Sequence, residues 1–155
     1  MHNDEINELR GILLKDFKAF VVFIYEKINK KKFNVNTHHN DLFEIVQRIV
    51  SGSCRRLLLN IAPRYGKTEV MVKMFIAWSL ARNPSARFIH LSYSDSLALD
   101  NSSEIKDIIL SDVYQWLFPY VQIKSDTKAK EKWYTTEGGG VLARSSSGQV
   151  TGFVS

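Results

Sequence analysis

The chain opens with apolar positions in a helical pattern. They recur at spacings of three and four residues, which places them on one face of a helix: Leu13, Phe17, Phe20, Val21, Ile24 and Ile28. This pattern predicts one continuous helix that covers a sheet with its apolar stripe. A second, shorter helix is predicted from Asp41 to Val50, ended by Gly52, with these residues inward: Leu42, Ile45, Val46 and Ile49.

Two later apolar runs have the length and continuity of strands buried on both faces of a parallel sheet. They are 57–61, Leu-Leu-Leu-Asn-Ile, and 87–92, Arg-Phe-Ile-His-Leu-Ser. After the first run come the loop 62–68 and a helix that ends at Asn83-Pro84, with one side formed by Val70, Met71, Met74, Phe75 and Trp78. After the second run, Ser94 or Asp95 can cap a helix that continues through Ile108.

This order of strand, helix, strand and helix predicts an α/β fold, with a right-handed crossover and helices on the faces of the sheet. Beyond Pro119 the pattern changes to two short strands, 133–136 and 138–143, joined by a glycine turn. The polar segment 145–153 has the composition of a surface loop.

Composition adds an ordinary globular core to this picture. Of the 155 residues, 45% are hydrophobic and 12% aromatic, which argues against intrinsic disorder and fits about one domain. The net charge of +5 is compatible with a nucleic-acid partner but is common in proteins that have none. The run Lys30-Lys31-Lys32 has two interpretations, a contact to DNA phosphate or a solvated helix end, and the second is the more frequent.

Neither a membrane span nor a secretory signal is expected. The apolar stretch from Leu13 to Ile24 contains three charged residues and is shorter than the roughly 20 residues that a spanning helix needs. The amino terminus has no basic region followed by an apolar region and small cleavage residues. The single cysteine, Cys54, cannot form an internal disulfide, so a reducing cytoplasm is the expected setting.

The loop after the first predicted strand carries the candidate chemistry, and its sequence is Ala62-Pro63-Arg64-Tyr65-Gly66-Lys67-Thr68. A helix amino end offers unpaired N–H groups to an anion, and Gly66 lets the backbone approach it closely. Lys67 would contact the β- and γ-phosphates of ATP, and the Thr68 hydroxyl would bind Mg²⁺. Arg64 is a second cation for the charge that develops on the γ-phosphate.

This loop departs from the full phosphate-loop pattern, which has glycine at the position of Ile61. A Gly-Lys-Thr triplet also occurs by chance, and Gly66 can make an ordinary strand-to-helix turn with Lys67 exposed. The predicted strand before the loop and the amphipathic helix after it favour phosphate binding.

The segment Pro63-Arg64-Tyr65-Gly66-Lys67-Thr68-Glu69 resembles the divergent phosphate loop of tailed-phage terminase large subunits, in which Pro-Arg-x-Gly-Lys-Ser/Thr-Glu is typical. Three other segments resemble the same family in the same order and at similar separations. They are His39 with Leu42, Leu91-Ser92-Tyr93-Ser94 with Leu97-Ala98, and Gly148-Gln149-Val150-Thr151-Gly152-Phe153. The likeness covers nearly the whole chain.

The resemblance implies a RecA-like P-loop ATPase domain that binds ATP and Mg²⁺ and drives double-stranded DNA into an empty capsid. It divides the chain into a helical region, 1–52, and a partial ATPase domain, 53–155. Pro63, Tyr65, Gly66, Lys67 and Thr68 would hold the nucleotide, Thr68 with the metal ion. Arg64 would sense or stabilise the γ-phosphate, and the region of His39 would lie near the base.

The implied partners are the portal protein, the small terminase subunit and other large-subunit copies in a ring, with no membrane. The implied location is the host cytoplasm, with transient docking at the procapsid portal and no secretion.

The chain departs from the family after Phe153, where the resemblance implies an apolar strand ending in the Walker B carboxylates, followed by a nuclease domain. Without them we expect ATP binding with little hydrolysis and no DNA cleavage. An intron, a split gene, a decayed prophage or a deliberate truncation would each interrupt the reading frame in this way.

Two other function classes remain open. A helicase-like P-loop ATPase shares the strand, loop and helix, but does not explain the segments around Tyr93 and 148–153. A module without catalytic activity would bind terminase subunits, the portal or DNA, and would not depend on Lys67.

Overall fold

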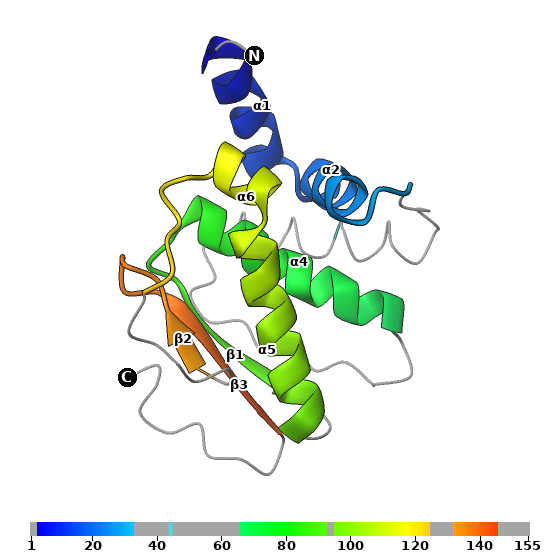
Figure 1. Ribbon diagram of the computed structural model, residues 1–155, viewed down its shortest axis with the longest axis vertical. Helices are drawn as coiled ribbons and strands as arrows, with labels where there is room; N and C mark the ends of the chain where they lie inside the picture. Colours follow the sequence, from blue (N-terminus) through cyan, green and yellow to red (C-terminus); the bar gives the residue numbers. More distant parts are fainter. Residues whose placement is uncertain (1–2, 33–43, 45–65, 93–94, 125–131, 146–155) are drawn as a thin grey trace.

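A computed structural model describes residues 3–32, 44, 66–92, 95–124 and 132–145, and it is a mixed structure of helices and strands. Figure 1 shows α1, α2 and α6 gathered at one end and the sheet toward the other, with α4 and α5 between them. The elements are α1 (Asn3–Lys15), α2 (Phe17–Asn29), α4 (Gly66–Arg82), β1 (Arg87–Ser92), α5 (Asp95–Leu110), α6 (Asp112–Leu117), β2 (Lys132–Tyr134) and β3 (Gly140–Ser145).

The prediction of one continuous amino-terminal helix is wrong, because α1 and α2 are separate helices. Asp16 between them is extended, with φ −125° and ψ 104°. Its side-chain oxygen accepts a hydrogen bond from the backbone N–H of Ala19 at 3.2 Å, which is the N-cap of α2. The predicted stripe is nevertheless buried in α2, from Phe17 to Ile24. Among the residues that the structure describes, this face packs against α4 and α6 and not against the sheet.

The elements predicted after Gly66 agree with the structure in type and order. Helix α4 ends at Arg82, directly before Asn83-Pro84, and β1 has the predicted bounds. Helix α5 begins at Asp95, within the pair Ser94-Asp95 where its start was predicted. The short helix α6 was not predicted; Ser111 caps it by accepting a hydrogen bond from the Tyr114 N–H. The predicted helix over 41–50, except for the single described residue Glu44, and the predicted strand over 57–61 lie outside the described residues. So does the predicted loop over 145–153, except for Ser145, which is the last residue of β3.

The three strands form one sheet in the order β1-β3-β2. Strand β3 pairs parallel with β1, from Arg87 with Gly140 to Ser92 with Ser145. It pairs antiparallel with β2, Trp133 lying opposite Val141. The predicted hairpin is therefore confirmed. The first strand of the predicted crossover lies outside the described residues.

The glycine turn of this hairpin is joined to the turn between α4 and β1. Thr135 is buried, and its hydroxyl donates to the carbonyl of Pro84 and accepts from the Gly139 N–H at 3.0 Å. The Gly140 N–H donates to the carbonyl of Ala86 at 2.9 Å. Gly138 has φ 91°, a conformation that glycine adopts at little cost. These bonds hold the start of β3 beside the start of β1.

Helices α4 and α5 cover the same face of the sheet. Phe88, Val141 and Trp133 lie in one row of the register and so share a face. The Phe88 ring contacts Phe75 of α4, with the ring centroids 6.1 Å apart. The Trp133 indole N–H donates to the Ser102 hydroxyl of α5 at 3.1 Å. The two helices therefore pack side by side over one layer of strands.

A single hydrophobic cluster joins the amino-terminal helices to α4, α5, α6 and the sheet. Its aromatic centre includes Phe17 and Trp78, whose ring centroids lie 5.1 Å apart, and Tyr114 and Phe118, at 5.0 Å. The largest fully buried side chains are Trp78, Trp133, Tyr114, Phe17, Phe20, Phe118, Ile24, Leu80, Ile105, Ile109 and Leu117. Residues from both predicted regions, 1–52 and 53–155, thus share one core.

Candidate functional site

The amino end of α4 contains the last three residues of the candidate phosphate loop. Gly66 is the first residue of the helix, and Lys67 and Thr68 follow in its first turn. The first four N–H groups of a helix have no partner within it, so this turn offers backbone donors to an anion. The structure therefore brings together Gly66, Lys67 and Thr68 of the predicted set, while Pro63, Arg64 and Tyr65 lie outside the described residues.

The body of α4 is buried in the core, and this packing fixes the helix that leads from Gly66. The sequence predicted one buried side, but Ile76, Ala77 and Leu80 are buried as well as Met74, Phe75 and Trp78. The reason is that α4 lies between partners: α1 and α2 contact it on one side, and α5 and the Phe88 ring on the other.

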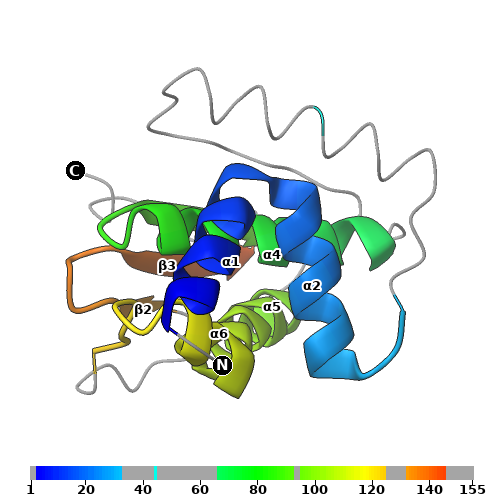
Figure 2. The same ribbon diagram turned by 90° about the horizontal axis from the view of Figure 1, so that it is seen from above.

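The direction of α4 relative to the strands places its amino end at a defined edge of the sheet. Figure 1 and Figure 2 show that the chain direction of α4 is roughly opposite to that of β1 and β3. Its amino end therefore lies on the side toward which both parallel strands point. In open α/β sheets this edge, at the carboxyl ends of the strands, is where ligands bind. Gly66, Lys67 and Thr68 thus occupy the expected edge for a phosphate site.

The helix dipole adds a partial positive charge at the same end. Arg82, in the last turn of α4, complements the negative end of the dipole, and its guanidinium lies 4.8 Å from the Trp78 ring centroid. Lys73 lies further along α4 and forms an ion pair with Glu104 of α5. Because Lys73 is only 11% exposed and is paired with a carboxylate, it is directed at α5 and not at an incoming phosphate.

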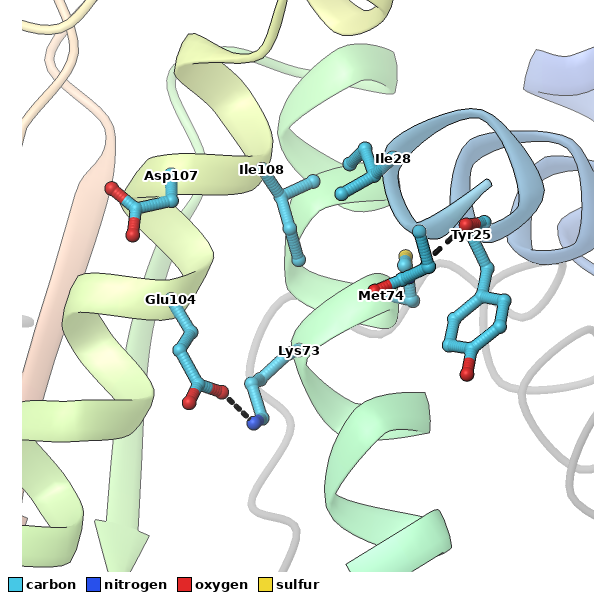
Figure 3. Close-up of a pocket in the computed structure, with 8 residues that line it drawn as sticks. Tyr25, Ile28, Lys73, Met74, Glu104, Asp107 and Ile108 are labelled. Atoms are coloured by element: carbon cyan, nitrogen blue, oxygen red, sulfur yellow. Dashed lines mark hydrogen bonds and ion pairs between the residues drawn. The ribbon is translucent and has the colours of Figure 1, made fainter. Parts of the chain in front are cut away.

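A pocket of about 350 Å³ opens between α2, α4 and α5 (Figure 3). Its lining residues are Tyr25, Ile28, Asn29, Lys73, Met74, Glu104, Asp107 and Ile108. Its size is that of a small-molecule site, with mostly apolar walls and the Lys73–Glu104 pair among its polar groups. Sequence reasoning missed this pocket because three separate helices form it, and no local motif marks its residues.

The shifted side-chain pKa values within the described part of the chain belong to two tyrosines near the other end of α4. Burial raises the pKa of Tyr114 well above its ordinary value, and the neighbouring Tyr120 adds to the effect. Burial also raises the pKa of Tyr120, which Arg10 partly offsets. The Tyr114 hydroxyl donates to the Ala77 carbonyl at 2.7 Å, and that of Tyr120 donates to the Ala81 carbonyl. These groups join the α6 region to α4 and lie away from Gly66.

A metal centre and a membrane span are two other kinds of site to consider in the described ranges. Residues 3–32, 44, 66–92, 95–124 and 132–145 contain no group of three or more histidine, cysteine, aspartate or glutamate side chains arranged to hold a metal ion. Over the same residues, none of the helices has both the length and the apolar character needed to cross a membrane.

Comparisons with known proteins do not assign the chain to a family. No protein-family model, curated protein or solved structure matches it.

Proposed function

We propose that this chain supplies the ATP-binding unit of a viral DNA-packaging motor of the terminase large-subunit type. The observation that carries the proposal is the position of Gly66-Lys67-Thr68 in the first turn of α4, a helix whose chain direction is opposite to that of two parallel strands. The order of the other terminase-like segments along the chain supports the same proposal. A RecA-like arrangement of the sheet, with β1 and β3 as its parallel pair, is part of it.

In this proposal, each residue of the first turn has a separate task. The backbone N–H groups after Gly66 bind phosphate oxygens, and the absence of a Cβ at Gly66 allows their close approach. Lys67 neutralises the β- and γ-phosphates, and Arg64 from the preceding loop adds a second positive charge. The Thr68 hydroxyl is the ligand that this turn offers to Mg²⁺. Once bound, the metal ion would shield the negative charge of the phosphates.

The proposed partners follow from the same assignment: double-stranded DNA, the portal protein, the small terminase subunit and further copies of the large subunit in a ring. Their meeting place would be the procapsid portal in the host cytoplasm. Coupling of hydrolysis to DNA movement belongs to the complete motor.

The test is titration of the purified chain with Mg²⁺-ATP in a calorimeter, beside Lys67→Ala. Removal of a charged hydrogen-bond donor costs about 1.5–3 kcal/mol. We therefore expect affinity to fall roughly 10- to 100-fold in the variant. Thr68→Ala should weaken binding when Mg²⁺ is present and leave the Mg²⁺-free affinity unchanged, because its assigned role is on the metal ion.

The matched control is Lys73→Ala, which removes the same charge from the same helix. Because Lys73 is paired with Glu104, this change should leave ATP affinity within a factor of two or so of the parent. Circular dichroism should show all four proteins folded. Equal losses in Lys67→Ala and Lys73→Ala would refute the assigned role of Lys67, and a folded parent that binds no ATP would remove the ATP site altogether.

A further inference from the structure

Four exposed lysines lie at and directly after the carboxyl end of α2, and we call them the lysine cluster: Lys27, Lys30, Lys31 and Lys32. The segment 26–32 holds these four positive charges and one negative charge, Glu26, a net of +3. Among the residues that the structure describes, no carboxylate forms an ion pair with Lys30, Lys31 or Lys32. Concentrated like charges repel one another, and a polyanion would relieve that repulsion.

Lys30 occupies a position where the backbone favours a different residue. It is the C-cap of α2, with φ 56° and ψ 33°, and it is the only non-glycine residue with positive φ in the described part of the chain. Glycine is the usual residue in this left-handed conformation. The cap bond, from the Lys30 N–H to the Glu26 carbonyl at 2.9 Å, uses the backbone alone. The fold therefore does not require the lysine side chain here, which indicates a role for its charge.

The opposite face of α2 decides between two kinds of polyanion. A helix that lies on a lipid surface inserts its apolar face beside its lysines. The apolar face of α2 is buried against the core at Phe17, Phe20 and Ile24, and only Ile28 near its carboxyl end is exposed, so the face offers little area to lipid. A surface that offers much charge and little apolar area suits the backbone of a nucleic acid, where lysine ammonium groups contact phosphates independently of sequence.

We propose that the lysine cluster is a contact site for the phosphate backbone of duplex DNA. Lys27 lies in the last turn of α2 and Lys30 caps it, with Lys31 and Lys32 directly after the cap, so the four lysines gather at the end of a helix whose other face is buried. The choice of DNA over another duplex rests on the proposed function, whereas the presence of a polyanion site does not.

The experiment measures binding of the whole chain to a fluorescently labelled DNA duplex by anisotropy, over a series of salt concentrations and without nucleotide. The test variant is Lys30→Ser/Lys31→Ser/Lys32→Ser. Each lost phosphate contact reduces the slope of log K against log salt by about 0.9, or about 2.7 for three. From about 50 to 200 mM salt, the parent should therefore lose roughly 40-fold more affinity than the variant.

The matched control is Lys18→Ser/Lys124→Ser/Lys132→Ser, which removes the same charge from three exposed and separate positions. It should keep nearly the parent slope, as should Lys30→Arg/Lys31→Arg/Lys32→Arg. Equal losses in the serine variants would show a general charge effect and overturn the site. Tighter binding of the parent to phosphatidylserine vesicles than to DNA would overturn the choice of partner.

Because nucleotide is absent from this assay, its result is separate from the ATP test. A chain that binds DNA through the cluster and binds no ATP keeps this inference and loses the ATP site. A chain that binds ATP and shows no dependence on the cluster loses this inference alone.

Discussion

Replacement of Trp78 tests how the amino-terminal helices are joined to α4. The side chain is fully buried, and its ring centroid lies 5.1 Å from that of Phe17. The indole N–H donates to the backbone carbonyl of Leu13 at 2.8 Å. Leu13 is the third residue from the end of α1, among the last four carbonyls that have no partner within a helix. Trp78 therefore satisfies a carbonyl that the break at Asp16 leaves without a helical donor.

Two variants separate the hydrogen bond from the packing. Trp78→Phe keeps an aromatic ring and removes the donor, which leaves a buried carbonyl unpaired at a cost of about 1–3 kcal/mol. Trp78→Ala also removes the ring from the core, and large-to-small changes of this kind cost about 3–5 kcal/mol. Because typical domains are stable by only about 5–15 kcal/mol, the alanine variant should be close to unfolding at room temperature.

The assay is urea unfolding followed by far-ultraviolet circular dichroism, since removal of a tryptophan alters the fluorescence signal. Trp116→Ala is the matched control, because Trp116 is 40% exposed on α6 and should cost no more than about 0.5 kcal/mol. A Trp78→Phe midpoint equal to that of the parent would refute the role of the indole–carbonyl bond. A control as damaging as Trp78→Ala would refute the assignment of Trp78 to the core.

Four further predictions concern pH and backbone conformation. Because burial raises the pKa of Tyr114, stability should be full below the unfolded-state pKa of about 10 and fall as pH rises above it. Tyr114→Phe should flatten that alkaline loss in urea unfolding and cost about 1 kcal/mol near neutral pH, through the lost bond to Ala77. Gly139→Ala would place a Cβ 2.2 Å from the Pro84 carbonyl oxygen, so we expect a loss of at least about 2 kcal/mol. By contrast, Gly11→Ala in α1 meets open space and should add about 0.5–1 kcal/mol; a loss there would contradict the helix assignment. Lys30→Gly should relieve the left-handed backbone strain at this cap and raise the free energy of unfolding by about 0.5–1 kcal/mol, which raises the urea midpoint. A lower midpoint would count against strain at this cap.

Local signals determined the elements that sequence reasoning placed correctly. Asn83-Pro84 ends α4 because proline disfavours helix in the residue before it. The glycines of the hairpin turn permit the backbone angles that the turn requires, as the φ of Gly138 shows. The triplet Gly66-Lys67-Thr68 was expected at a helix amino end, and α4 begins there. Each of these features depends on a few neighbouring residues, so it can be read without the fold.

The tertiary structure decided what depends on distant contacts. The apolar period runs without interruption through Asp16, but the cap bond to Ala19 and the Trp78 indole, 65 residues away from Leu13, stabilise two helices in its place. Likewise, the pairing of β1 with β3, the direction of α4 relative to that pair and the pocket between α2, α4 and α5 arise only when separated segments pack together. Spacing along a chain sets which face of an element is apolar. Which partner covers that face is decided by long-range packing and by the hydrogen-bonding groups that the packing must satisfy.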